Sequence, residues 1–374
     1  ARLKILYWRN LMSYSERTKL YQDFKKERGN PLIVYVTSGR PGADGRIAQD
    51  AIRQFVLQLD LFKDPIKNID LIINSFGGDG LTSWRLITML RELIGTDGKI
   101  TCFVPFYAFS AATLIAVGCD EIFLHPLASL GPVDPQITVQ KKEGPQQFAY
   151  EDVSAYTNFL KDEAGITEQK EKVTLLSHLV NQIEPSVIGA SKRASMQSII
   201  MAEKLLKLHM KGADAQNAEI IAEKLSKNYF SHGHAVSRTE AKDLGLKISD
   251  RNDKIEKLLW EIFKDFEAEM KMNEPFDPTA IYLGNPQSST LLNPPPIANL
   301  PSNLPPQVAQ QAWNQVLASI STSQGPVLDF ELKHAAIESE FHSSFFVTKG
   351  KIIGCRQPDM NFRIGTPRLS AKWE

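Results

Sequence analysis

Ser110 is the residue whose position in the sequence most favours chemistry. It lies between two apolar runs, residues 100–104 and 111–117, which we expect to form a strand and a short helix. A serine at such a turn projects its hydroxyl from the edge of a sheet, and the first N–H groups of the helix can stabilise an oxyanion. The same position also suits a serine that caps the helix. By position alone, Ser110 is a nucleophile or an N-cap.

A glycine pair follows the strand expected at residues 69–73. The segment reads Asn74-Ser75-Phe76-Gly77-Gly78 and precedes a helix expected at residues 81–93. Paired glycines let the backbone approach a substrate and direct N–H groups at a developing negative charge. A plain turn and a phosphate cradle are the alternatives, but the sequence patterns of a P-loop and of a dinucleotide-binding turn are absent. Turns that end parallel strands meet at one edge of the sheet, where ligands bind.

A nucleophilic serine needs a base and an orienting carboxylate. Of the seven histidines, His232 and His234 lie in a polar loop, Ser231-His232-Gly233-His234. Asp134 lies between two prolines in a stiff loop, where it is either the orienting carboxylate or a turn residue. The two histidines have no nearby cysteine or carboxylate at ligand spacing, so we expect neither a metal nor a cofactor.

The supporting elements predict an α/β fold with a mainly parallel sheet. Apolar runs that read as strands alternate with amphipathic helices, which places helices over a parallel sheet. Residues 151–225 have mainly helical patterns. The expected strands are 32–36, 69–73, 100–104, 121–124 and 246–248, and the expected helices are 47–59, 81–93, 111–117, 239–244 and 255–272.

Composition divides the chain into four parts. We expect an N-terminal helical segment at 1–30, a catalytic domain at 31–272, a proline-rich linker or arm at 273–306, and a C-terminal extension of unknown role at 307–374. Nine of the 21 prolines fall between Pro275 and Pro306, which is typical of a linker or a wrapping arm that docks a partner. Within the extension, residues 345–355 could form a hairpin around Lys349-Gly350.

Charge and cysteine content restrict the class of protein. The chain has 43 basic and 43 acidic residues, so no nucleic-acid partner is expected. Its three cysteines do not form a disulfide framework, which favours the cytoplasm. No run approaches the roughly 18 apolar residues of a membrane span. An anchor upstream of Ala1 would make the protein membrane-associated.

Taken together, these segments resemble the serine dehydrogenase proteinase family, a branch of the Clp protease and crotonase superfamily related to signal peptide peptidase A. The Gly77-Gly78 segment is similar to the oxyanion turn of the superfamily, with Phe76 in place of the usual proline. Residues 108–112 are similar to its nucleophile segment. Further similar segments, in the same order, are 118–122, 130–136, 232–234 and 236–246.

The resemblance implies a fold of repeated β-β-α units and a serine protease with the triad order Ser110, Asp134, His232 or His234. His232 is the first choice by loop alignment. The oxyanion hole would comprise Gly77, Gly78 and Ala111, and the substrate would be a polypeptide. Members of the superfamily form trimers, hexamers or larger rings, so a homo-oligomer is expected.

Three alternatives stay open. Signal peptide peptidases use a Ser–Lys dyad, but the corresponding region here reads Tyr150-Glu151-Asp152, with lysines only at 141, 142 and 161. Glu151 or Asp152 could instead be the orienting carboxylate. The chain could also be a non-catalytic scaffold with this fold, or a crotonase-like enzyme acting on acyl-CoA, although such enzymes have no use for a serine at position 110.

Overall fold

The computed structural model describes residues 14–141, 144–227, 233–288, 303–321, 324–356 and 361–374. The chain divides into two compact units. The first unit comprises residues up to Thr37, residues 46–266 and residues 337–343, and the second comprises residues 38–45, 267–336 and 344–374. The four-part division expected from composition stays a prediction.

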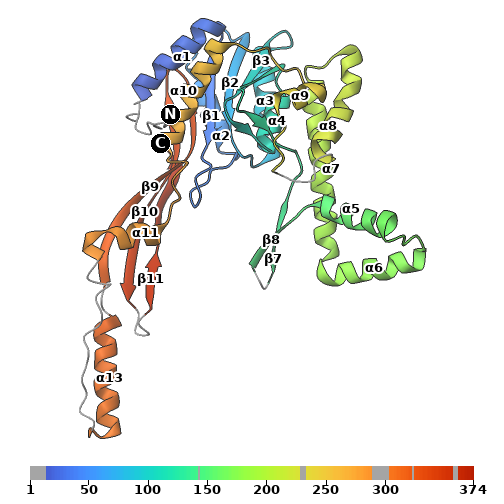
Figure 1. Cartoon of the computed structure of the whole chain (residues 1–374). Helices are drawn as coiled ribbons and strands as arrows, with labels where there is room; N and C mark the ends of the chain where they lie inside the picture. Colours follow the sequence, from blue (N-terminus) through green and yellow to red (C-terminus); the bar gives the residue numbers. More distant parts are fainter. Residues whose placement is uncertain (1–13, 142–143, 228–232, 289–302, 322–323, 357–360) are drawn as a thin grey trace, which may run out of the picture. The chain divides into compact units, whose positions relative to one another are not determined.

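A parallel sheet forms the centre of the first unit (Figure 1). Its elements are β1 Leu32–Thr37, α2 Ala51–Asp60, β2 Asn68–Asn74, α3 Gly80–Ile94, β3 Lys99–Val104, α4 Ala111–Val117 and β5 Glu121–Leu124. The strands pair in parallel in the order β1-β2-β3-β5. Every residue of β1 is buried, as are six of the seven in β2, because helices cover both faces of such sheets. The predicted α/β fold with a mainly parallel sheet is confirmed.

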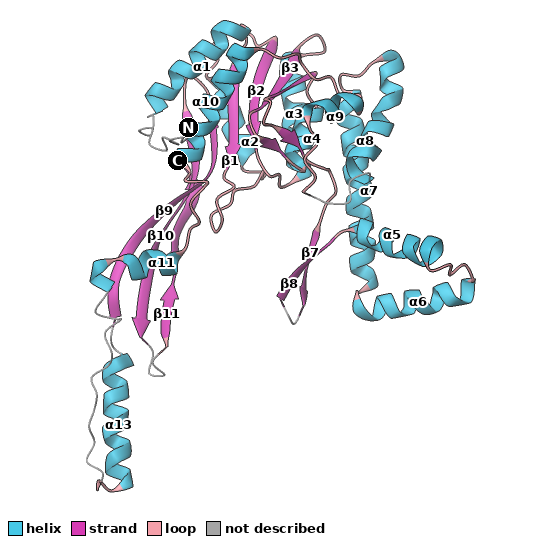
Figure 2. Ribbon diagram, in the orientation of Figure 1, coloured by secondary structure: helices cyan, strands magenta, loops and turns pink. Residues whose placement is uncertain are grey.

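The remaining elements of the first unit are mostly helical (Figure 2). Helix α7 contacts α3, α4, α5 and α8. None of the described helices is long and apolar enough to cross a membrane. The elements are α1 Tyr14–Arg28, β4 Tyr107–Ala108, β6 Ser129–Leu130, β7 Ile137–Lys141, β8 Gly144–Phe148, α5 Tyr150–Asn158, the π-helix Phe159–Glu163, α6 Gln169–Gln182, α7 Pro185–Lys207, the 3-10 helix Gly212–Gln216, α8 Asn217–Lys227, α9 Arg238–Asp243 and α10 Asp253–Glu269.

The second unit contains a group of antiparallel strands. Its elements are α11 Pro278–Gly284, the 3-10 helix Pro286–Ser288, α13 Pro306–Ser321, β9 Gln324–Glu338, β10 Ser343–Arg356, β11 Phe362–Gly365 and β12 Arg368–Trp373. Strand β10 pairs antiparallel with both β11 and β12. Buried Tyr282 and Ile352 form a small core with Phe276 and Phe330 packed against it.

Two local predictions are wrong. The expected hairpin at residues 345–355 is one continuous strand, β10, with an irregularity between Lys349 and Gly350. Gly350 serves close packing rather than a turn, since a Cβ there would lie 2.5 Å from the Phe330 ring and 2.6 Å from the Pro367 carbonyl oxygen. Residues 246–248 form only an isolated bridge, Ile122 to Ile248, instead of a strand.

A buried arginine connects α1, α10 and the end of β9 within the first unit. Arg17 is fully buried and donates from Nε (2.9 Å) and Nη2 (2.6 Å) to the two carboxylate oxygens of Glu338. It also pairs with Asp265, and its guanidinium lies 4.3 Å from the centre of the Phe266 ring. The cluster balances charges that burial would otherwise penalise.

Replacing Arg17 by methionine should therefore destabilise the fold severely. The substitution keeps a long side chain but leaves Glu338 and Asp265 buried without their cation. We expect the free energy of unfolding to fall by about 3–5 kcal/mol, measured by urea denaturation. Lys26→Met, which breaks only an exposed pair with Asp23, should cost less than about 1 kcal/mol. Equal losses in the two variants would contradict this role of Arg17.

Candidate active site

Ser110 adopts a backbone conformation that a helix cap does not use. It lies between β4 and α4 with φ 52° and ψ −116°, and its side chain makes no capping hydrogen bond. An N-cap residue normally has an extended backbone and accepts a bond from the helix. Positive φ in a residue with a Cβ is strained and is concentrated at functional turns. Ser110 therefore occupies the N-cap position without capping the helix through its hydroxyl, and the conformation is that of a serine displayed on a sharp turn.

The glycine pair lies directly against this turn. Gly77 and Gly78 have φ 109° and 146°, values open to glycine alone without strain. A Cβ on Gly77 would lie 2.8 Å from the Cβ of Ser110, and a Cβ on Gly78 would lie 2.3 Å from the Ile47 carbonyl oxygen. The backbone bond from Phe109 N–H to the Ser75 carbonyl (2.9 Å) ties the two turns together. The expected meeting of the two turns at one edge is confirmed.

Two N–H groups beside Ser110 are available to an oxyanion. The Gly78 and Ala111 N–H groups have no acceptor among the residues that the structure describes. The N–H of Gly77 is already used, since it donates to the Ser75 hydroxyl at 3.0 Å. That hydroxyl in turn accepts from Thr37 at 2.7 Å. Gly77 thus contributes its shape to the turn, while Gly78 and Ala111 contribute the free donors.

Asp134 is held in a buried loop. Its side chain is only 7% exposed. The preceding residue, Val133, donates its N–H to the Leu225 carbonyl (2.9 Å), and its own carbonyl accepts from Ser198 (2.9 Å) and Ser226 (2.8 Å). Three hydrogen bonds to α7 and α8 therefore fix the backbone just before the carboxylate.

A ladder of short backbone pairings brings the three candidate segments side by side. Ala108, two residues before the serine, pairs with both Ser75 and Leu130. Leu130, four residues before Asp134, also pairs antiparallel with Val236. His234 is two residues before Val236. The serine, aspartate and histidine segments are thus neighbours in space although more than a hundred residues separate the first from the last.

Of the two candidate histidines, the structure describes only His234. His232 lies outside the described residues. The side chain of His234 is 42% exposed, and its Nε2 lies 3.1 Å from Oε1 of Glu240. Glu240 is therefore a possible orienting carboxylate that the sequence analysis did not identify. Its position three residues after Ser237, which caps α9, was the available signal. The Ser110 hydroxyl has no hydrogen-bond partner among the residues placed by the structure.

The alternative Ser–Lys dyad has weaker local support. Lys161 is in the π-helix with 65% of its side chain exposed, 3.6 Å from Asp162. The side chain of Lys141 and all of Lys142 lie outside the described part of the chain.

The two alternative orienting carboxylates already form hydrogen bonds within the fold. Glu151 accepts from the Ser195 hydroxyl at 2.7 Å, and Asp152 accepts from the Ala149 N–H at 3.0 Å.

Aromatic side chains surround the serine turn. Phe76, at the position where the resembled family usually has proline, is 51% exposed. Its ring stacks on Tyr107 with centres 3.9 Å apart and meets Phe109 edge-on at 5.8 Å. Phe109 packs in turn on Gly131, where a Cβ would lie 2.6 Å from the ring. The exposed Phe76 ring therefore places apolar surface next to Ser110 and the Gly77-Gly78 turn.

Comparisons with known proteins found similar sequences and structures. Two uncharacterized proteins of Methanocaldococcus jannaschii are similar to the chain, one 29% identical over 181 residues (48% of this chain, 52% of the relative) and the other 27% identical over 202 residues (53% and 59%). The chain thus spans about half the length of these relatives.

Two solved structures of the 1510-N membrane-bound stomatin-specific protease are also similar. One is a serine-to-alanine mutant with 14% identity and a TM-score of 0.35, covering 61% of this chain and 84% of that one. The other is a lysine-to-alanine mutant in complex with a substrate peptide, with 14% identity and a TM-score of 0.36, covering 60% and 78%.

The family match covers the region around Ser110. Residues 56–149 match the family described as ClpP-like SDH-type serine proteinase. This segment includes both glycine-turn residues, Ser110 and Asp134, and ends before the histidine loop. Over residues 56–149, the chain is thus similar to the ClpP-like SDH-type serine proteinases.

Proposed function

We propose that this protein hydrolyses peptide bonds through an acyl-enzyme on Ser110. The observation that carries the proposal is the strained, non-capping conformation of Ser110 with the Gly77-Gly78 turn packed against it. Strain of this kind persists only where the surrounding structure imposes it, and it is concentrated where a side chain must be displayed for reaction. The family match to serine proteinases supports the same reaction class.

The reaction divides into two acyl transfers. The Ser110 oxygen attacks the peptide carbonyl carbon while its proton passes to a histidine. The developing oxyanion accepts hydrogen bonds from the N–H groups of Gly78 and Ala111. The C–N bond then breaks, and the histidine returns the proton to the leaving amine. Water attacks the acyl-serine by the same route, which frees the carboxylate product and restores the serine hydroxyl.

His232 is the first choice for the base, with Asp134 as its orienting carboxylate. His234 is the alternative, and its contact with Glu240 would then supply the orientation that a triad needs. The two assignments therefore predict different carboxylates as well as different histidines. Asp134 is buried and held by its loop, as suits a group that holds an imidazole, whereas Glu240 is more exposed.

A fluorophosphonate probe tests the nucleophile directly. It phosphonylates only a serine that a base and an oxyanion hole activate. We expect the full chain to be labelled at one site, identified by mass spectrometry as Ser110, and the Ser110→Ala variant to show no labelling. Ser83→Ala is a matched control, because Ser83 lies in the neighbouring helix and bonds the Ala111 carbonyl. Folded wild-type protein that resists the probe would count against the proposal.

The remaining expectations concern the environment of the protein. We propose polypeptide substrates, self-assembly into a trimer or a larger ring, and a cytoplasmic location. The proline-rich region at 273–306 is the proposed contact to a partner or a neighbouring subunit. The exposed Phe76 ring, held in place by stacking on buried Tyr107, supports substrates with apolar side chains near the cleaved bond, because aromatic rings bind such groups well.

A further inference from the structure

A cavity of about 440 Å³ lies in the first unit, at the sheet edge opposite the candidate active site. Lys99, the first residue of β3, and Asp120, just before β5, line it. Gly77 and Ser110, in contrast, follow the carboxyl ends of β2 and β4. The volume is within the range of small-molecule sites. The cavity shares no residue with the catalytic machinery.

The cavity has an apolar floor and a polar rim. Five floor residues are buried, namely Val117, Cys119, Ile122, Leu206 and Leu246. The rim side chains are exposed, namely Lys99, Lys247, Asp214 and Asn217. An apolar floor with a few polar groups around it is the usual construction of a site for a small organic ligand.

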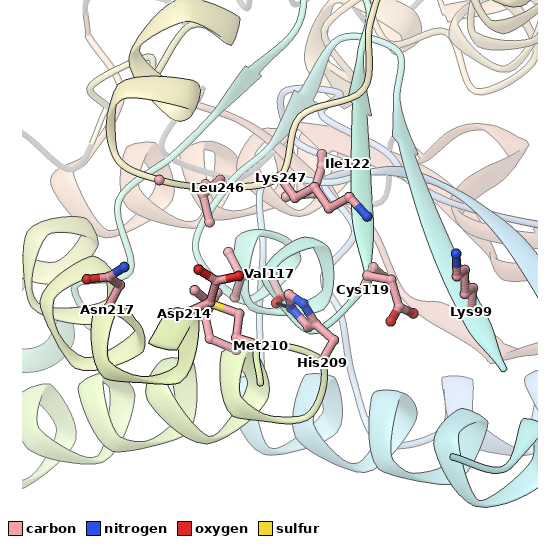
Figure 3. Close-up of a pocket in the computed structure, with 13 residues that line it drawn as sticks. Lys99, Val117, Cys119, Ile122, His209, Met210, Asp214, Asn217, Leu246 and Lys247 are labelled. Atoms are coloured by element: carbon pink, nitrogen blue, oxygen red, sulfur yellow. Dashed lines mark hydrogen bonds between the residues drawn. The ribbon is translucent and has the colours of Figure 1, made fainter. Parts of the chain in front are cut away.

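Opposite charges lie at opposite ends of the cavity. Figure 3 shows Asp214 and Asn217 on one side and Lys247 and Lys99 on the other, with His209 between them. In the described part of the chain, none of the three charged rim side chains forms an ion pair with another residue. The rim therefore offers one anionic and one cationic end to a ligand.

Asp120 and His209 also line the cavity, but neither adds an uncompensated charge to it. Asp120 is compensated, since it pairs with Arg91 at 2.7 Å and accepts from the Ile100 N–H at 2.7 Å. The Nε2 of His209 lies 2.9 Å from the Val117 carbonyl oxygen. A carbonyl only accepts, so Nε2 carries the proton and Nδ1 is an acceptor. Burial lowers the pKa of His209, which keeps the ring neutral at pH 7.

We infer that this cavity binds a zwitterionic ligand of the size of a dipeptide. Its carboxylate would face Lys99 and Lys247, its ammonium group would face Asp214, and its side chains would cover the apolar floor. Inorganic phosphate would leave Asp214 and the floor unused, and a purely apolar molecule would leave both charged ends unused. Short peptides are also products of the proteolysis proposed above; that source rests on the proposed function, whereas binding does not.

Isothermal titration calorimetry on the Ser110→Ala variant of the whole chain tests the inference, because the proposed mechanism leaves this variant without a nucleophile to cleave the peptide. The probes are Ala-Leu, Ala-Leu amide and N-acetyl-Ala-Leu. We expect saturable binding of Ala-Leu and about tenfold weaker binding of each blocked peptide, which lacks one charge. Lys247→Gln should weaken the binding of Ala-Leu about tenfold but should not weaken the binding of the amide, which already lacks the carboxylate. Asp214→Asn should likewise weaken the binding of Ala-Leu about tenfold but not that of the acetylated peptide, which already lacks the ammonium group.

Matched substitutions outside the cavity provide the control. Lys63→Gln and Asp64→Asn remove the same charges from an exposed loop after α2 and should leave the affinity unchanged. Absence of saturable binding would overturn the inference. So would binding that ignores both Lys247→Gln and Asp214→Asn, since the peptide would then sit elsewhere, including at the catalytic turn. Either failure leaves probe labelling of wild-type Ser110 unaffected, so the two proposals fail separately.

Discussion

Alanine in place of His232 is expected to lower kcat/KM for a peptide substrate by roughly 10³-fold or more. Without a base, Ser110 keeps its proton and is a poor nucleophile at neutral pH. Because the base acts in the transition state, the loss should fall on kcat and leave KM nearly unchanged. The measurement is steady-state hydrolysis of a fluorogenic peptide by wild type and variant.

His234→Ala is the matched control for this loss. If His232 is the base, removing His234 costs a partly exposed contact with Glu240 but leaves the base in place, and activity should change by less than about threefold. A large loss for His234→Ala and a small one for His232→Ala would reassign the base. Glu240→Gln would then impair turnover, while Asp134→Asn would not. If neither histidine matters, the Ser–Asp–His assignment fails and the Ser–Lys dyad becomes the leading alternative.

Gly78→Ala is expected to reduce kcat about 10²- to 10³-fold, the usual effect of losing one oxyanion donor. The new Cβ would lie 2.3 Å from the carbonyl oxygen and 2.6 Å from the nitrogen of Ile47. The turn must move to relieve this overlap, which displaces the Gly78 N–H from the oxyanion. The positive φ adds strain, and we expect the free energy of unfolding to fall by about 1–3 kcal/mol.

Gly95→Ala separates backbone strain from this displacement. Gly95 also has positive φ, 74°, and nothing lies within 4 Å of the position of its missing Cβ. It ends α3, the helix that begins after the glycine turn. We expect a stability loss of about 1–3 kcal/mol, as for Gly78→Ala, and unchanged kcat. Fluorogenic hydrolysis and thermal unfolding of both variants provide the measurements. Full activity in a folded Gly78→Ala variant would remove this turn from the oxyanion hole.

The central elements follow from the sequence because their signals are local. The strand expected at 69–73 is observed at Asn68–Asn74, and the helix expected at 111–117 has those bounds. Both are almost completely buried, so their apolar runs are continuous and end at polar or glycine residues. The glycine pair was also identifiable, since few other residues tolerate the backbone that such a turn needs.

The second unit was hardly predictable because its strands depend on contacts between distant residues rather than on local patterns. Strand β10 runs through Gly350, and its residues are buried, half-buried or exposed without a simple alternation. Its partners β11 and β12 follow it in sequence, but the pairing depends on packing around Tyr282 and Ile352. In the sequence, Arg17 looks like an ordinary surface residue of a charged helix. Its burial depends on contacts with Asp265 and Glu338, which are distant in the sequence.

The sequence by itself located a candidate nucleophile and a candidate oxyanion turn along the chain, and named the histidines and carboxylates that are candidates for the base and its orienter. Only the tertiary structure decided that the Ser110 hydroxyl does not cap its helix. The reason is that the sign of φ at one residue is not encoded in its type: the fold imposes it here, by pressing the Gly77 backbone against Ser110. The tertiary structure also decided that His234 contacts Glu240. It likewise decided that Asp214 and Lys247 lie at opposite ends of the far cavity.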